Sequence, residues 1–470
     1  MARILFLHES AFEFLGVLTL CGYLEEKGHE VEVLVKSEEG ANFWDKVRDF
    51  KPDWAGFSTI FSLHQESYAL AKEIKERFGT KTVFGGPYIS YEPVGIHRDE
   101  VDVVIRGEGE EALVDLLNAS DRGEDYSNIS NVWTIIDGKE KFNPPRPFET
   151  DLDKYPVPDR KYYYKYPFIR NQHLKHFISG RDCPYNCYFC FNCEFRKLYG
   201  VTIYKLRRRS PEHVMEELRK VKADYPLTTL AFDDDVFPID QTWLEDFLPK
   251  YNREIGVPFS CNIHAGMVKK DVVRLLAENC CRHVMMGLES GNPRVRREIL
   301  GKKFSNQLFL NAADLLHRKG IKIMTYNILG NPTETLEEAL DTVRMNNTAR
   351  IDYPWWSIYQ PIMGTRTTQI AIDHGYISAD FNTDRIMESI FHRSYLNQPE
   401  IRQVERLHKL FLLGVKFKFM IPVIKLMSKW NLMPVYTQIF LVSYFYRHWK
   451  ESGMNFFKML LMGIKQLKKY

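Results

Sequence analysis

Short apolar runs alternate with helix-length amphipathic stretches through the first ~120 residues of the chain. The runs are rich in branched and aromatic side chains and predict strands, whereas apolar residues at every third or fourth position predict helices. The expected strands are residues 4–7, 31–35, 54–58, 82–84 and 101–105. Helices are expected between them, for example at 15–27 and 63–77, with Gly28 and Gly79 where helices end. This alternation predicts an α/β domain over residues 1–150 with a doubly wound, Rossmann-like parallel sheet.

A second α/β series follows a proline-rich linker at residues 151–175. Its expected strands are 176–179, 229–232, 259–262, 284–287, 322–328 and 356–360. Helices such as 211–223 and 271–278 separate them. Six such units make about three quarters of an eight-stranded barrel, so we expect a partial (β/α)6 barrel over residues 176–375. From 376 to 470 the strand pattern stops, and the pattern predicts helices.

Charge is unevenly distributed along the chain. The formal net charge is +3, yet residues 401–470 hold 13 Lys and Arg against 2 Glu, a net of about +11. Aromatic and aliphatic residues are interspersed among these cations. This composition is typical of amphipathic helices that lie on anionic membranes. The alternative is a helical cap over the open side of the partial barrel, with solvated lysines outside.

No apolar run reaches the ~20 residues that a membrane-spanning helix needs, and the N-terminus lacks the features of a signal peptide. We therefore expect a cytoplasmic protein, with peripheral membrane contact through the C-terminal region as a further expectation. In a reducing compartment, clustered cysteines bind metal more often than they form disulfides.

Three of the eight cysteines stand in one loop, directly after the first expected barrel strand. Cys183, Cys187 and Cys190 have the spacing C-x3-C-x2-C, at the end of the strand where barrel enzymes place their chemistry. Three thiolates can hold three irons of a four-iron cluster and leave the fourth iron open to another ligand. The alternative is a zinc-bearing scaffold module with Cys193 as the fourth ligand.

With this motif and several segments at later strand ends, the chain resembles the radical SAM superfamily. The arrangement of all 470 residues resembles the cobalamin-binding branch, which includes anaerobic magnesium-protoporphyrin monomethyl ester cyclases and cobalamin-dependent methyltransferases. The resemblance implies an enzyme whose 4Fe-4S cluster cleaves S-adenosylmethionine (SAM) to a 5′-deoxyadenosyl radical. It also implies an electron donor such as flavodoxin or ferredoxin.

The resemblance assigns SAM-binding residues along the barrel. Phe189, directly before the last cysteine, would lie near the adenine. Asp234 and Asp235 end the second barrel strand, where the family places polar groups that grip the methionine ammonium. An acidic helix N-cap cluster together with Asp240 is the alternative interpretation of these aspartates.

Three further positions follow from the same resemblance. Glu289 and Ser290 end the fourth strand, and an acidic residue that ends an apolar strand is unusual as pure core. Gly330 begins the loop after the fifth strand, which would lie beside the adenine, although it could equally shape a turn. His264 stands where many relatives carry Arg, and is a candidate substrate contact or proton donor, with a structural role as the alternative.

Residues 1–150 lack the Asp-x-His-x-x-Gly loop whose His ligates cobalt in cobalamin domains of the methionine-synthase type. His8 ends the first strand, but neither the Asp nor the Gly is in register. The expected strand ends, where open sheets bind ligands, carry Ser58, Thr59, Gly85, Gly86, Pro87, Gly107, Glu108 and Gly109. Glycines let the backbone approach a large cofactor closely. We expect cobalamin binding without a protein His on cobalt; the alternative is a domain that only docks on the barrel.

These features lead to one functional hypothesis and two alternatives. The hypothesis is methylation of an unactivated carbon of a small or lipid-like substrate, with SAM as both radical source and methyl donor. A cyclase or rearrangement enzyme with the same cofactors is one alternative, and the zinc scaffold is the other. Nucleic acid is disfavoured as a partner, because the similar tRNA methylthiotransferases carry a cysteine trio in the N-terminal domain, where this chain has only Cys21.

Overall fold

The computed structural model describes the chain except residues 62, 202–205, 382, 384–385, 387–392 and 453–470. The chain forms two compact units. The first comprises Met1–Asn186, Cys190–Phe259 and Met363–Thr365, and the second comprises the remaining residues. The first unit thus holds the N-terminal domain, the linker and the first part of the barrel.

A seven-stranded sheet is the centre of the N-terminal domain, with the strand order β2-β1-β3-β4-β5-β6-β7. Its five parallel strands are β1 (Arg3–His8), β2 (Glu30–Val35), β3 (Trp54–Ser58), β4 (Lys81–Gly85) and β5 (Val103–Ile105). They confirm the five strands expected from the sequence. Nearly all their residues are buried on both faces, as is typical of parallel strands flanked by helices.

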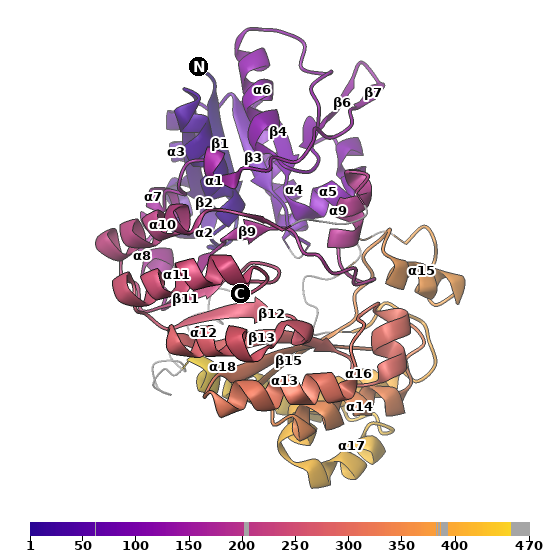
Figure 1. Cartoon of the computed structure of the whole chain (residues 1–470). Coiled ribbons are helices and arrows are strands. Elements are labelled where there is room, and N and C mark those ends of the chain that lie inside the picture. The colour runs from indigo at the N-terminus through magenta and orange to yellow at the C-terminus, as the bar shows by residue number, and fades with distance from the viewer. Residues whose placement is uncertain (62, 202–205, 382, 384–385, 387–392, 453–470) are drawn as a thin grey trace. The chain divides into compact units, whose positions relative to one another are not determined.

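Helices cover both faces of this sheet (Figure 1). On one face, α3 (Phe43–Phe50) and α4 (His64–Phe78) pack with the strands into a single apolar cluster. On the other face, α1 (Leu15–Glu26) packs against α6 (Glu110–Asp121). Two covered faces define the doubly wound architecture that the sequence predicts.

The edge of the sheet is an antiparallel hairpin that the sequence analysis did not predict. It consists of β6 (Val132–Ile136) and β7 (Lys139–Phe142). All four residues of β7 are exposed, so the strand lacks the apolar run that marked the others. The available signal was the turn, because Asp137 and Gly138 both adopt positive φ, as Asp-Gly does in tight hairpins.

The second sheet has six strands in the order β15-β14-β13-β12-β11-β8. In the first unit, β8 (Leu174–Phe177) pairs in parallel with β11 (Thr229–Phe232). β12 (Phe259–Ile263) begins at the boundary between the units. In the second, β13 (Cys281–Glu289), β14 (Lys322–Leu329) and β15 (Tyr353–Ile358) pair in parallel. The partial barrel is confirmed, although β15 begins three residues before the expected strand, because an edge strand tolerates Pro354.

Helices separate these strands, as expected. They are α10 (Pro211–Asp224), α11 (Gln241–Glu254), α12 (Lys270–Glu278), α13 (Asn306–Arg318) and α14 (Leu336–Thr348). The linker also contains two short helices, α7 (Lys161–Tyr164) and α8 (Pro167–Arg170). Asp240 caps α11 by accepting from the backbone N–H of Trp243 (3.1 Å).

The C-terminal region is helical where the structure describes it, and residues 453–470 lie outside the described residues. Its helices are α16 (Ile401–Lys416), α17 (Ile421–Met427) and α18 (Met433–Ser452), preceded by α15 (Arg366–Asp373). α16 packs against α14 and the edge strand β15, where the Trp356 indole N–H donates to the His408 carbonyl (2.8 Å). No described helix is both long and apolar enough to cross a bilayer.

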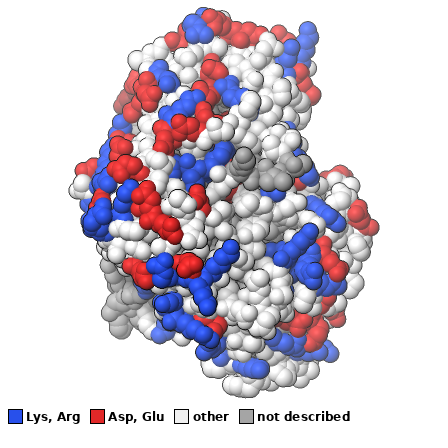
Figure 2. Space-filling view, viewed as in Figure 1, with Lys and Arg blue, Asp and Glu red and all other residues white. Residues whose placement is uncertain are grey.

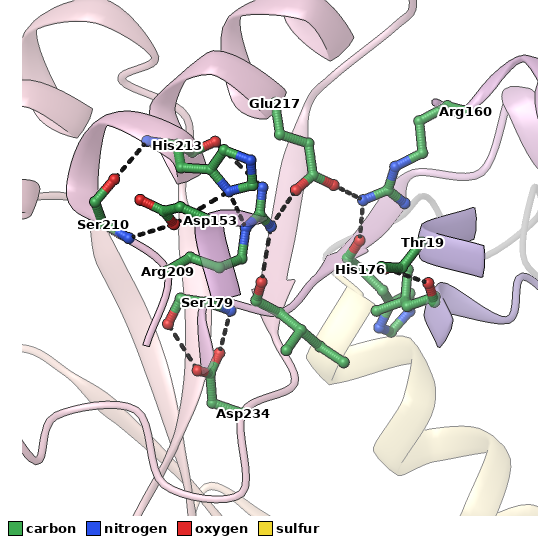
Figure 3. A network of polar contacts seen from close by, with 12 residues as sticks. Thr19, Asp153, Arg160, His176, Ser179, Arg209, Ser210, His213, Glu217 and Asp234 are labelled. Atoms are coloured by element: carbon green, nitrogen blue, oxygen red, sulfur yellow. Dashed lines mark hydrogen bonds and ion pairs between the residues drawn. The ribbon is translucent and has the colours of Figure 1, made fainter. Parts of the chain in front are cut away.

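A buried polar network ties the linker to the first barrel strand (Figure 3). Glu217 of α10 is 1% exposed and accepts from the guanidinium groups of Arg160 and Arg209, each at 2.5 Å. Arg160 also donates to the carbonyl of His176 (2.9 Å). Burial alone would raise the pKa of Glu217, but Arg209 and Arg160 hold that pKa below its ordinary value. One carboxylate therefore joins α10, the linker and β8.

Replacing Glu217 with Gln should lower the free energy of unfolding by about 3–5 kcal/mol, because Arg209 loses its buried counter-charge and Arg160 keeps only Glu13. Denaturant unfolding followed by circular dichroism measures this change. Glu216→Gln is the matched control, since Glu216 is the neighbouring, exposed residue of α10 and should change stability by less than about 0.5 kcal/mol. Equal stability of the two variants would contradict the assigned role of Glu217.

Candidate functional site

A cavity of about 600 Å³ lies within the first unit, at the carboxyl ends of the N-terminal strands. Its walls include seven of the eight residues expected there, namely Ser58, Gly85, Gly86, Pro87, Gly107, Glu108 and Gly109. Thr59 is the exception. It is buried, and its N–H and hydroxyl both donate to the Gly85 carbonyl (2.8 and 2.9 Å), so it joins β3 to β4. The volume is within the range of small-molecule and cofactor sites.

Two glycines at this edge are required by their surroundings. Gly86 has φ +94°, and a Cβ there would meet the backbone N and O of Thr59 at 2.8 Å. Gly107 has φ +96°, and a Cβ there would overlap the Tyr199 hydroxyl. Glycine adopts this backbone conformation without steric penalty, which is why the strand ends can fold this tightly beside the cavity.

The cavity has walls of contrasting polarity. α1 and the segment before it contribute apolar side chains that include Phe12, Phe14 and Leu20. The linker and the first part of the barrel contribute polar groups that include Arg160, His176, Arg207 and Asp233. Such a site suits a ligand with a large apolar body and a few polar groups.

Glu108 does not present a free carboxylate to this cavity. The carboxylate lies 3.1 Å from Arg181 and 2.7 Å from Arg207. Burial would raise the pKa of Glu108, but these guanidinium groups lower it below its ordinary value. Because Arg181 belongs to β9 (Gly180–Arg181) and Arg207 to β10 (Arg207–Arg208), Glu108 joins the loop after β5 to that small sheet.

His8 is buried and is not among the residues that line this cavity. Its Nε2 is 2.8 Å from the Tyr163 hydroxyl, and its ring stacks on Phe14 at 4.3 Å. Burial lowers the pKa of His8 to about 3, so the imidazole is neutral at physiological pH. His8 therefore packs within the domain, in agreement with the absent Asp-x-His-x-x-Gly motif.

A histidine–carboxylate pair that the sequence did not predict lines the same cavity. His176 Nδ1 is 2.8 Å from a carboxylate oxygen of Asp233. Burial would lower the pKa of His176, but the hydrogen bond and the charge of Asp233 raise it. The register of β8 and β11 pairs His176 with Ala231, which brings Asp233 beside it. Only this pairing reveals the contact, because the two residues are 57 positions apart.

The cysteine loop lies between β9 and α9 (Asn192–Leu198). Arg196 of α9 is buried and donates to the carbonyls of Cys183 (2.7 Å) and Tyr185. The Cys193 thiol donates to Asn186 Oδ1 (3.0 Å). No three His, Cys, Asp or Glu side chains of the described residues converge on a single-ion site. A four-iron cluster does not need such convergence, because its cysteines bind different irons.

The middle of this loop belongs to the second unit. The Tyr188 N–H donates to the Leu300 carbonyl (3.0 Å), and the Tyr188 carbonyl accepts from Thr367 N–H (3.2 Å). The Tyr188 ring covers Gly301, where a Cβ would lie 2.6 Å from it. Phe189 and Ile328 pack against one apolar cluster, which contains Tyr359, Ala371, Ile377 and Leu396. Phe189 thus shares a cluster with the strand that ends at the Gly330 loop.

The two aspartates after β11 have different partners. Asp234 is 2% exposed and accepts from the N–H (3.0 Å) and the hydroxyl (2.6 Å) of Ser179. These bonds join the ends of β8 and β11, which favours a structural role for Asp234. Asp235 accepts from the Asn192 amide (3.0 Å), directly after the cysteine loop. Burial raises the pKa of both carboxyls.

Glu289 forms a buried ion pair that the sequence analysis missed. Its carboxylate is 2.9 Å from the Lys302 ammonium. Glu289 has φ +61° next to a bulge in β13, a backbone conformation that is strained for a residue with a side chain. A Cβ on Gly287 would overlap both charged groups, so only glycine leaves room for the pair. The Ser290 hydroxyl accepts from Asn292 N–H (3.2 Å) and shapes the turn that follows.

The Gly330 loop is organised by Glu334, which also was not predicted. One oxygen of Glu334 accepts from the N–H of Gly330 (2.6 Å) and of Asn331 (3.0 Å). Gly330 has φ +75°, so it does shape a turn. Burial raises the pKa of Glu334 to about 8, although the hydrogen bonds from Asn331 and Gly330 oppose this shift.

His264 lies in the turn after β12. Its Nδ1 accepts from Gly266 N–H (3.1 Å), and its ring meets the edge of Phe304 at 5.6 Å. Burial and the charge of Lys302 lower the pKa of His264 to about 3. The imidazole of His264 is neutral, and its Nδ1 accepts a backbone hydrogen bond within the turn. These two features favour a structural role for His264 over the role of a proton donor.

Family models match both the barrel and the N-terminal domain. Residues 177–345 match the radical SAM superfamily, and residues 9–117 match the B12 binding domain. The cysteine loop and the ends of β11, β13 and β14 lie within the first match. The strand-end glycines lie within the second.

Several relatives and solved structures are similar to the chain over most of its length. The chain is 27% identical to an uncharacterized methyltransferase of Pyrococcus horikoshii, over 76% of this chain and 78% of the relative. It is 25% identical to the anaerobic magnesium-protoporphyrin IX monomethyl ester cyclase of Rubrivivax gelatinosus, over 76% of this chain and 68% of the cyclase. The radical SAM methyltransferase TsrM of Kitasatospora setae, solved with cobalamin and a 4Fe-4S cluster, matches with a TM-score of 0.68 and 17% identity. That match covers 80% of this chain and 76% of TsrM.

The fold and the matches define a radical enzyme with an added corrinoid-binding domain. The chain combines a radical SAM domain, matched over residues 177–345, with a B12-binding domain, matched over residues 9–117. Its cofactors are a 4Fe-4S cluster, SAM and cobalamin, as the sequence predicts.

The raised pKa of Glu334 predicts a pH-dependent stability. The folded protein keeps this carboxyl protonated up to about pH 8, whereas an unfolded chain releases the proton near pH ~4.3. The stabilisation that the Glu334 carboxyl gives to the folded state is therefore complete below pH ~4.3 and is lost as the pH rises through about 8. Glu334→Gln retains the acceptor oxygen and cannot ionise.

The melting temperature of the native protein should consequently fall relative to Glu334→Gln between pH ~5.5 and ~8.5. Differential scanning fluorimetry of the two proteins across this range measures the difference. Glu337→Gln is the control, because Glu337 is exposed on α14 and its pKa is below the ordinary value. A pH-independent difference between native protein and Glu334→Gln would contradict the prediction.

Proposed function

We propose that this enzyme transfers the methyl group of SAM, by way of cobalamin, to an unactivated carbon of a small or lipid-like molecule. The supporting observation is that a single cavity is lined by residues from both cofactor regions. Gly86 and Gly107 come from the B12-binding domain, and Phe191 and Asn192 directly follow Cys190 of the cysteine loop. A ligand in this cavity would contact both.

The residues present fit the cofactors of the family. Cys183, Cys187 and Cys190 would hold the cluster, on a loop whose carbonyls Arg196 fixes. When bound, the cluster supplies the electron that cleaves SAM to a 5′-deoxyadenosyl radical, and cobalamin supplies the methyl group. The strand-end glycines carry no side chain and would let the corrinoid approach the backbone.

The chain also offers charged groups of both signs for the methionine part of SAM. Glu289 provides a carboxylate for its ammonium, and Lys302 provides an ammonium for its carboxylate. The strained backbone at Glu289 supports this assignment, since strain of this kind persists where function requires it. Phe189 would contact the adenine from the cluster that it shares with the end of β14.

A radical cyclase or rearrangement enzyme is the second candidate. The similarity to the Rubrivivax gelatinosus cyclase, over most of this chain, is the observation that favours it. The same cofactor residues would serve both reactions. The difference lies in the fate of the substrate after hydrogen abstraction, so an isotope experiment separates them.

The protein, purified and reconstituted without oxygen, would be incubated with a reductant, methyl-deuterated SAM and an organic extract of its native host. The proposed reaction should give a product that carries the deuterated methyl group, together with 5′-deoxyadenosine and S-adenosylhomocysteine. A cyclase should give 5′-deoxyadenosine without transfer of deuterated methyl. An identified product without the deuterated methyl group would contradict the methyltransferase proposal and support the cyclase or rearrangement reaction.

Substitutions of the cysteines test the cluster assignment separately. Ala at Cys183, Cys187 or Cys190 should remove most of the bound iron and sulfide and abolish 5′-deoxyadenosine formation, because the cluster loses one of three ligands. Cys193→Ala is the matched control and should leave both quantities near native values, because its thiol contacts Asn186. Loss of iron only in the Cys193 variant would refute the assignment.

A further inference from the structure

The C-terminal helices expose an unusual amount of apolar surface. Seven large apolar side chains, each 45–75% exposed, fall within residues 417–435. They are Phe417, Phe419, Val423, Leu426, Trp430, Leu432 and Val435. By contrast, the described part of the preceding 416 residues exposes three large apolar side chains to this degree, Met1, Phe12 and Val94, which are scattered along the chain. Clustered exposure of this kind marks an interaction surface, whereas single exposed residues do not.

The packing of the second unit does not account for this surface. α17 already buries Ile421 and Ile424 in the cluster that it shares with α14 and α16. Val423 and Leu426 are exposed on the same short helix. A helix that only covers a core is polar on its outer side, whereas the outer side of α17 exposes Val423 and Leu426 beside one charged residue, Lys425.

The charged residues within the segment 417–435 are all lysines. Between Glu405 and Glu451 the sequence contains eight Lys and Arg and neither Asp nor Glu. Lys418 and Lys429 are exposed and stand next in sequence to Phe419 and Trp430. On the face seen in Figure 2, the part of the second unit where Figure 1 places α17 is largely white with blue groups. One acidic residue reaches this region from α14, where Glu337 pairs with Lys425 at 2.6 Å.

A small basic cavity adjoins the exposed segment. It has a volume of about 230 Å³, and its walls include Lys416, Arg447, Lys450 and Asp352. Arg447 is 3% exposed, and its Nε has no hydrogen-bond acceptor among the described residues. Asp352 already accepts from Lys322 and from Ile323 N–H, both at 3.0 Å. Arg447 also forms an ion pair with Glu451 at 3.4 Å, so Lys416 and Lys450 supply the remaining positive charge of this cavity.

We propose that residues 417–435 form a docking face that rests on an anionic lipid bilayer. The exposed aromatic and aliphatic side chains would enter the interface, while Lys418 and Lys429 would meet the lipid phosphates. A second copy of this chain fits the face less well, because a symmetric contact would bring like charges together. The proposal does not depend on the methyltransferase assignment.

The first test compares sedimentation of the native full-length protein with vesicles of phosphatidylcholine alone or with phosphatidylglycerol added. The native protein should bind the anionic vesicles, and binding should weaken steeply with salt. The variant Phe419→Glu/Trp430→Glu should bind them at least about tenfold more weakly, because two apolar anchors become charged. Both positions are more than half exposed, so the fold should persist.

The matched control is Leu308→Glu/Lys270→Glu. It replaces an exposed apolar residue of α13 and an exposed lysine of α12, in the same unit but away from the docking face in sequence. This control should bind anionic vesicles as the native protein does. Iron and cobalamin content, measured for every variant, should remain unchanged, which separates membrane docking from the catalytic assignment.

The second test reverses the charges with Lys418→Glu/Lys429→Glu. This variant should lose about tenfold or more in binding to anionic vesicles, with little change toward neutral ones. Native protein that does not bind anionic vesicles, or docking-face variants that bind as tightly as the control, would overturn the proposal. If light scattering then shows that Phe419→Glu/Trp430→Glu dissociates a native dimer, the face belongs to a second copy of the chain.

Discussion

The first unit depends on one buried carboxylate between two guanidinium groups. Glu217 holds Arg160 of the linker and Arg209 of the segment before α10, and these arginines hold the carbonyls of His176 and Ile178. Removing three charges from water is unfavourable unless each finds a partner of opposite sign or an acceptor. Moving the linker away from β8 would separate Arg160 from Glu217. Glu217 would then remain buried without one of its two positive partners. This constraint fixes the polar wall of the cavity at which the cofactor regions meet.

Two of the proposed SAM-binding segments contain a residue with positive φ, and a charged or polar side chain supports each of them. Glu289 adopts a left-handed conformation beside Lys302, in space that Gly287 leaves open. Gly330 also has positive φ, and Glu334 accepts from its N–H. Such conformations are retained when surrounding contacts over-determine them. The supporting residues are as necessary to the site as the residues that would touch SAM.

The matched family models indicate the cofactors but not the final reaction. An uncharacterized methyltransferase and an anaerobic magnesium-protoporphyrin IX monomethyl ester cyclase each match 76% of this chain. Both chemistries begin with the same radical, so the residues of the cluster loop and the barrel strand ends cannot distinguish them. The distinction must lie in the residues that contact the substrate, where His176 and Asp233 line the cavity. The apolar docking face is consistent with a substrate that is itself lipid-like.

The sequence by itself determined the local elements and the chemistry of contiguous motifs. Hydrophobic periodicity predicted the five parallel strands and the partial barrel, because burial on both faces leaves long apolar runs. The cysteine spacing predicted the cluster loop, because its three cysteines lie within eight consecutive residues. The glycines at the strand ends were found because parallel strands bring their carboxyl ends to one edge.

Tertiary structure alone decided the contacts between residues far apart in sequence. The pairs His176–Asp233, Glu217–Arg160 and Glu289–Lys302 are 57, 57 and 13 positions apart, and no local pattern marks them. Structure also separated residues of similar appearance, since Asp234 joins two strands, whereas Asp235 contacts the residue that follows the cysteine loop. Strand register and helix packing set these distances. A side chain's partners depend on what folding brings beside it, which the sequence around that residue does not specify.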